Sequence, residues 1–139
     1  MAGYQWDWPH TRKWPRFSGE KVDIIKKMFL AGEALNVDNF IKFFTDDCHY
    51  QFGNFPPARS PQEIAASSTG FIEKCEGLHH HIVNVWETDD GTLFCEMEVT
   101  YINHNGKVFT LPCCDIIRFE GDKVKELKIF MDINPLFNG

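Results

Sequence analysis

The chain has 139 residues, 43% of them hydrophobic and 24% charged, which is enough for one globular domain with a single apolar core. Its formal net charge of −6 at pH 7 argues against a nucleic-acid or anionic-membrane surface, because either requires a clustered basic face. No stretch approaches the ~20 apolar residues of a membrane span, and the first residues lack the apolar segment of a signal peptide. Five cysteines in hydrophobic contexts are typical of reduced thiols, so we expect a cytoplasmic protein.

The first 19 residues are rich in tryptophan and proline and have neither helical nor strand periodicity. We interpret residues 1–19 as an aromatic, proline-rich arm that lays its side chains across the rest of the chain. Such an arm could cover the mouth of a cavity. Residues 20–139 are then expected to form a single α+β domain.

Three helices are predicted in the N-terminal half. Between about residues 20 and 34, apolar side chains recur at helical spacing with charges between them. A second, short helix is expected after Asn36, which suits an N-cap, because apolar residues then repeat at i, i+3, i+4 and i+7. The third helix has the plainest start: Ser60 can cap it, Pro61 suits the first helical position and Glu63 completes a capping box.

Strand patterns occupy most of the rest of the sequence. The segment "CHYQFGNF" alternates like a strand before a Pro-Pro loop, and after Gly77 the hydrophobic period changes from helix to strand. Short Gly-containing turns separate the later segments, which indicates an antiparallel meander. The expected architecture is α+β, with helices on one face of a curved sheet. The four later segments cover residues 79–88, 92–102, 107–120 and 123–133.

One acid lies in the middle of an otherwise apolar strand, "LPCCDIIRF" at residues 111–119. The other residues on the face of Asp115 are Leu, Cys, Ile and Phe, so its side chain is expected to point inward with them. Burying an ionised carboxylate is costly unless it is paired, hydrogen-bonded or kept protonated. Asp115 is therefore the first candidate for a functional residue; the alternative is that it only fixes strand register through a hydrogen bond.

Residues 20 to 137 resemble a known superfamily. The two N-terminal helices, the phrase "FFTDDCHYQF" and the closing "LPCCDIIRFEGDKVKELKIFMDINPLF" are similar to the nuclear transport factor 2-like superfamily, nearest to its SnoaL-like and ketosteroid-isomerase-like branch. The resemblance implies a cone, in which a curved, mostly antiparallel sheet wraps three helices and encloses an apolar pocket. It also implies a homodimer formed through the outer sheet face.

The resemblance implies a functional role for one residue of this chain. In ketosteroid isomerases, a strand phrase of the form P-x-D-x-F-R-F carries an acid that stays protonated and donates a hydrogen bond to the substrate oxyanion. Asp115, in "CCDIIRF", matches that position. Met28 and Phe52 stand where those enzymes have their tyrosine and their aspartate base, so the resemblance does not imply a standard ketosteroid isomerase. Ile129 falls near the last-strand acid of limonene-epoxide hydrolases, which this chain therefore also lacks.

Several other residues are candidates for the pocket. Tyr101 and Tyr50 are expected on inward faces and could donate hydrogen bonds to a substrate oxygen or to Asp115; the alternative is a core aromatic with a satisfied hydroxyl. Asp132 resembles the acid that frequently closes the last strand of SnoaL-like proteins, but an Asp before Asn-Pro also forms turns. The side chains expected to line the substrate pocket are those of Phe52, Met28, Met97, Trp86, Phe119 and Ile129.

Three consecutive histidines invite a metal interpretation. On a strand, His79 and His81 would face one way and His80 the other, so at most two could bind one ion, and no spacing supplies further ligands. We therefore expect no metal site. A single histidine that enters the pocket as an acid or base is the better interpretation, because its ordinary pKa suits proton transfer near neutrality. We take His81 as the candidate, although alternation alone does not choose between it and His80.

Two functions follow from these patterns. The first is a cofactor-independent acid/base enzyme of the isomerase, cyclase or dehydratase type, which uses Asp115 on a small, apolar, oxygenated molecule. The second is a non-catalytic small-molecule-binding or dimerisation domain of the same fold, because one scaffold hosts both. An inward acid together with abundant aromatic side chains favours the enzyme.

Overall fold

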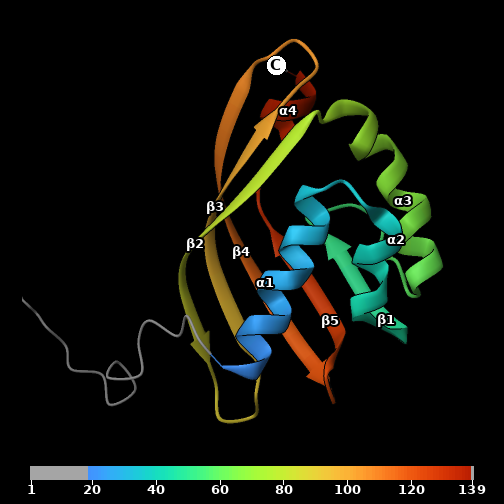
Figure 1. Ribbon diagram of the computed structural model, residues 1–139, viewed down its shortest axis with the longest axis vertical. Helices are drawn as coiled ribbons and strands as arrows, with labels where there is room; N and C mark the ends of the chain where they lie inside the picture. The colour runs from blue at the N-terminus through green and yellow to red at the C-terminus, as the bar shows by residue number, and fades with distance from the viewer. Residues whose placement is uncertain (1–18, 139) are drawn as a thin grey trace, which may run out of the picture.

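A computed structural model describes residues 19–138, in which helices cover one face of a curved five-stranded sheet (Figure 1). The strands lie in the order β1-β5-β4-β3-β2. The expected α+β architecture is therefore confirmed. The predicted arm, apart from Gly19, lies outside the described residues, so the domain boundary at residue 20 stays a prediction.

The helices begin where the sequence predicts them. Helix α1 (Glu20–Glu33) buries Val22, Ile25, Met28 and Phe29 against the sheet. Helix α2 (Val37–Phe40) begins at Asn36, whose side chain accepts a hydrogen bond from the backbone N of Asn39, and a single 3₁₀ turn, η2 (Ile41–Phe43), follows it. A short C-terminal helix, α4 (Asn134–Asn138), has no counterpart among the sequence predictions.

Helix α3 (Pro61–Lys74) has a modified capping box. The Ser60 hydroxyl accepts a hydrogen bond from the backbone N of Glu63 at 3.1 Å, as expected. The Glu63 carboxylate in turn accepts from the backbone N of Arg59 at 2.9 Å, one residue earlier than in the standard box. The two bonds fix the direction in which the chain enters the helix.

The strands form the expected meander with one addition. Strands β2 (Gly77–Glu87), β3 (Leu93–Ile102), β4 (Val108–Glu120) and β5 (Lys123–Phe130) pair antiparallel with their neighbours in sequence. Each connecting turn contains a glycine with positive φ, a conformation in which a side chain would be strained. Strand β1 (Phe44–Phe52) pairs parallel to β5, so it closes the opposite edge of the sheet from β2.

A bulge in β2 changes which side chains face inward. The pairing register between β2 and β3 shifts between Ile82 and Asn84. Before the bulge, His80 pairs with Val99. After the bulge, Val85 pairs with Cys95, and the side chains of Val85 and Cys95 are fully buried. Because the extra residue resets the alternation, His80 and Val85 lie on the same inner face although an odd number of positions separates them.

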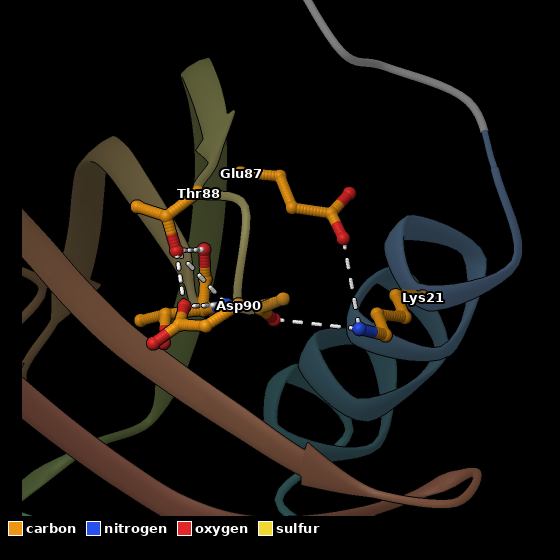
Figure 2. A network of polar contacts seen from close by, with 6 residues as sticks. Lys21, Glu87, Thr88 and Asp90 are labelled. Atoms are coloured by element: carbon orange, nitrogen blue, oxygen red, sulfur yellow. Dashed lines mark hydrogen bonds and ion pairs between the residues drawn. The ribbon is translucent and has the colours of Figure 1, made fainter.

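Polar contacts hold the N-terminal end of α1 to the β2–β3 turn (Figure 2). The Lys21 ammonium lies 3.6 Å from the Glu87 carboxylate and donates a hydrogen bond to the carbonyl of Gly91 at 3.4 Å. Within the turn, the hydroxyl of Thr88 donates to the carboxylate of Asp90. These contacts tie the start of α1 to the β2–β3 turn, at the end of the helix opposite the cavity.

Candidate functional site

A cavity of about 430 Å³ lies between the inner sheet face and the helices, at the C-terminal end of α1. All five strands and all four α-helices of the described chain contribute to its walls, which are mostly apolar and aromatic. This size and composition are typical of a site for a small organic molecule. Its polar groups include the side chains of Asp115, Tyr50, Tyr101, His80, Ser68 and Lys74.

Asp115 lines this cavity from the middle of β4. It pairs with Cys95 on one side and Ile129 on the other, and its residue surface is only 2% exposed. Burial disfavours the carboxylate and raises the pKa of Asp115 from 3.8 to about 7, against the opposing effect of a hydrogen bond from the thiol of Cys113. Near neutral pH the group can therefore both give and take a proton.

Two tyrosines reach the cavity from different strands. Tyr101 on β3 donates a hydrogen bond from its hydroxyl to the sulfur of Met131 at 3.2 Å, and its ring meets the edge of Phe71. Tyr50 on β1 packs edge-on against Phe44, and within residues 19–138 its hydroxyl has no hydrogen-bond partner. Burial raises the pKa of both tyrosines well above the ordinary value, so both hydroxyls remain protonated donors at neutral pH.

The histidine that lines the cavity is His80, not His81. His81 is exposed on the other face of β2, so its assignment to the pocket is corrected. Alternation alone could not choose between the two histidines, because the bulge changes which residues of β2 face inward. The side chain of His80 is 14% exposed and its Nδ1 lies 3.0 Å from the carboxylate of Glu33, the last residue of α1.

The structure separates the predicted pocket residues into two groups. Phe52, Met97 and Ile129 line the cavity as expected. Three others do not. Met28 is fully buried in the core beneath α1; the bulge turns Trp86 away from the inner face. Phe119 lies at the far end of β4, where the Lys21 ammonium sits 5.8 Å from its ring centre.

Asp132 also lies outside the cavity lining, so its catalytic assignment is corrected. Its side chain is exposed and accepts a hydrogen bond from the backbone N of Asn134 at 3.0 Å. This is the turn-forming role of an Asp two residues before a helix. The bond lies at the entry to α4, a helix without a clear signal in the sequence.

The described part of the chain holds no cluster of three or more His, Cys, Asp or Glu side chains that could bind a metal ion. The five cysteines, all within this part, are free, and burial is the main cause that raises the pKa of the Cys113 thiol. Across residues 19–138 there is also no helix with the length and apolarity needed to cross a membrane.

The chain belongs to the SnoaL-like domain family, whose sequence pattern matches residues 25–127. This match covers most of the chain and confirms the resemblance to the SnoaL-like branch of the nuclear transport factor 2-like superfamily. Comparison with curated protein sequences gives no match.

Solved structures with the same fold share little sequence with this chain. A hypothetical protein from Catenulispora acidiphila with a ketosteroid isomerase-like fold, in complex with trimethylamine, has 14% identity and a TM-score of 0.74, over 84% of this chain and 90% of that one. A putative SnoaL-like polyketide cyclase from Jannaschia has 15% identity and a TM-score of 0.71, over 86% and 90%. An epoxide hydrolase from M. tuberculosis, of the LEH-like type, has 14% identity and a TM-score of 0.69, over 86% and 87%. At these identities, the likeness establishes the fold and not the activity.

Proposed function

We propose that this protein is a cofactor-independent enzyme that uses Asp115 as a general acid and base on a small, largely apolar, oxygenated molecule. The observation that carries the proposal is the position of Asp115: a nearly inaccessible carboxyl group on the wall of an apolar cavity of about 430 Å³, with a pKa raised to about 7. Efficient proton transfer needs a pKa near the working pH, and this group meets that condition.

The cavity walls indicate the substrate class. Aromatic and aliphatic side chains surround a few polar groups, so a ligand would be mainly apolar with one or two oxygens. The protonated Asp115 carboxyl and the hydroxyl of Tyr50 can donate hydrogen bonds to such an oxygen and stabilise negative charge that develops on it. Isomerisation, cyclisation and dehydration all involve a charge of this kind. The putative cyclase from Jannaschia, which has the same fold, is consistent with this range of reactions.

The proposal does not extend to the standard ketosteroid isomerase mechanism. That mechanism requires a tyrosine and an aspartate base at the places that Met28 and Phe52 occupy here. Met28 lies outside the cavity lining and Phe52 contributes only an apolar wall. Where the protonated Asp115 serves as the acid, a separate base must therefore come from another residue.

A non-catalytic ligand-binding domain is the alternative, and one observation favours it. Asp115 already has a hydrogen-bond partner, Cys113, within the protein. A carboxyl group satisfied in this way could serve only to hold β4 in register or to select an oxygenated ligand. Binding without turnover would then be the whole function.

Asp115→Asn distinguishes the two functions. Small molecules that copurify with the protein are extracted and identified by mass spectrometry, and each is tested for turnover by the wild type. We expect the Asn variant to bind the substrate but to lose at least ~100-fold in turnover, the usual contribution of a general acid or base. Asp122→Asn, a matched change at an exposed turn residue, is expected to leave turnover unchanged. Wild-type turnover in Asp115→Asn would contradict the proposal.

A further inference from the structure

A second titratable pair lies on the cavity wall, formed by Glu33 and His80. One carboxylate oxygen of Glu33 accepts two hydrogen bonds from the same residue: from the backbone N of His80 at 2.8 Å and from its ring Nδ1 at 3.0 Å. The ring of Phe29 stacks on the imidazole, with ring centres 4.4 Å apart and an interplanar angle of 12°. Two contacts from α1 thus fix the orientation of the His80 ring, and a third holds its backbone.

This arrangement selects one tautomer of His80. An ionised carboxylate only accepts hydrogen bonds, so Nδ1 must carry the proton that it shares with Glu33. The lone pair of the neutral ring is then on Nε2. Within residues 19–138, Nε2 has no hydrogen-bond partner, and the side chain lines the cavity. The ring is therefore built as a proton acceptor that a ligand can reach.

Burial favours the neutral ring at rest. Burial lowers the pKa of His80, against the opposing effects of its hydrogen bond and charge interaction with Glu33. His79, next to it on β2, also lowers that pKa and lies 3.8 Å from the other oxygen of Glu33. Lys74 of α3 and Asp115 of β4 are the other lysine, arginine or acidic side chains in the same lining. Once His80 takes a proton, Glu33 stabilises the resulting imidazolium.

We propose that His80 is the base and Asp115 the acid of a single enolisation step, with Glu33 as the residue that positions His80. This inference rests on the proposed function. It supplies a base to this chain, which has Met28 and Phe52 where ketosteroid isomerases have their tyrosine and their aspartate base. The substrate class it assigns is an apolar ketone or ester with an acidic C–H next to the carbonyl. His80 Nε2 removes that proton, the C–H electron pair forms a C=C bond, and the carbonyl oxygen takes the proton of Asp115. The products are an enol, an imidazolium and a carboxylate. In the return step His80 gives its proton back to carbon and the enol O–H gives its proton back to Asp115, which restores the carbonyl group and both residues.

The tautomer is tested first, without any substrate. In ¹⁵N-histidine-labelled protein, long-range ¹H–¹⁵N correlation spectra assign the protonated nitrogen of each neutral imidazole. We expect His80 to carry its proton on Nδ1, and the conservative variant Glu33→Gln to lose this preference. A wild-type His80 with its proton on Nε2 would overturn the inference, while leaving the role of Asp115 untouched.

The chemistry is tested by deuterium exchange. A panel of apolar ketones is incubated with the protein in D₂O, and incorporation next to the carbonyl is followed by NMR. We expect exchange by the wild type, a loss of ~100-fold or more in His80→Gln and in Asp115→Asn, and a smaller loss in Glu33→Gln with a changed pH profile. His104→Gln, a matched change at an exposed turn histidine, should exchange as the wild type does.

Two results overturn the inference in different ways. If His80→Gln exchanges at the wild-type rate while Asp115→Asn does not, His80 is only structural and the proposed function survives. If the wild type exchanges none of the ketones, enolisation is wrong for this cavity. Circular dichroism and the midpoint of thermal unfolding show whether His80→Gln is folded, and the tautomer measurement on the wild type stands independently of that variant.

Discussion

The thiol of Cys113 donates a hydrogen bond to Oδ1 of Asp115 across 3.3 Å, from two residues earlier on the same face of β4. A donor to the carboxylate stabilises the charged form, so this bond lowers the pKa of Asp115. Burial has the larger effect and raises that pKa. The net value of about 7 is thus the balance between desolvation and one weak donor. Small changes at position 113 should shift it.

We therefore predict opposite shifts from two substitutions of Cys113. Cys113→Ala removes the donor and should raise the pKa of Asp115, while Cys113→Ser supplies a stronger O–H donor and should lower it. The carboxyl C=O stretching band in infrared difference spectra reports the protonation of Asp115 as pH changes. Cys114→Ala, on the opposite face of β4, is the control and should leave the titration unchanged. Shifts in the same direction for Ala and Ser would show that the hydrogen bond does not set the pKa.

Stability should depend on pH through Asp115 with a definite sign. Between pH about 4 and about 7 the folded protein keeps the proton of Asp115, whereas the unfolded chain has lost it. Unfolding then releases a proton, so the free energy of unfolding should fall as pH rises through this window, by on the order of 1 kcal/mol per pH unit. Urea denaturation at a series of pH values measures this slope.

Other groups titrate in or near the same pH window. The contribution of Asp115 is therefore the difference between the pH dependence of the free energy of unfolding in the wild type and in Asp115→Asn. The lowered pKa of His80 acts in the opposite sense, because stability is lost as pH falls through its range. The lowered pKa values of Asp90 and Glu126 also act in that sense, at lower pH. These contributions cancel between the two proteins. Parallel stability curves for the wild type and Asp115→Asn would mean that the buried carboxyl titrates normally.

The two cavity tyrosines should respond differently to loss of their hydroxyls. Tyr101→Phe removes the hydrogen bond to Met131 and should cost about 1 kcal/mol or less in the free energy of unfolding. Tyr50→Phe removes a hydroxyl without a partner in the described chain, so it should leave stability unchanged and weaken the binding of an oxygenated ligand about tenfold. Thermal unfolding and calorimetric titration measure the two effects. Equal ligand affinity in Tyr50→Phe and the wild type would exclude Tyr50 from the binding site.

The homodimer that the superfamily resemblance implies remains a prediction, and the outer sheet face offers a test. Phe130 pairs with Cys114, which neighbours Asp115 in β4, so its side chain lies on the sheet face opposite that of Asp115. On this face Phe130 is 55% exposed. Phe130→Glu should convert a particle of twice the 16.1 kDa chain mass into a monomer in analytical ultracentrifugation. Leu30→Glu, at a 62% exposed position on α1, is the control and should leave the mass unchanged. A wild-type monomer would contradict the prediction.

Most of the fold could be predicted from local sequence signals. The capping residues Asn36 and Ser60 mark helix starts by bonds that span three residues, and glycines at the meander turns mark strand ends. The inward position of Asp115 follows from strict alternation along β4. The parallel pairing of β1 with β5 could not be predicted, because it joins segments about 80 residues apart with no local signature.

The site was predicted less completely because one irregularity hides it. A bulge after Ile82 breaks the alternation of β2, so the sequence pattern alone could not choose between His80 and His81, and the structure places His80 in the cavity lining. The partner of His80, Glu33, is 47 residues away on another element, and no spacing in the sequence connects them. For Asp132 the sequence left two interpretations open, because turn formation and catalysis favour the same residue type before Asn-Pro, and the structure shows the turn-forming hydrogen bond.

The pKa of Asp115 tests the central claim most directly. In protein labelled with ¹³C at aspartate carboxyl groups, the signal that is lost in Asp115→Asn identifies this residue, and its chemical shift is followed from acidic to alkaline pH. A buried acid on the cavity wall predicts a midpoint near 7. A midpoint near the ordinary value of 3.8 would mean that water or an unrecognised partner stabilises the carboxylate, and would contradict the proposed acid and base chemistry.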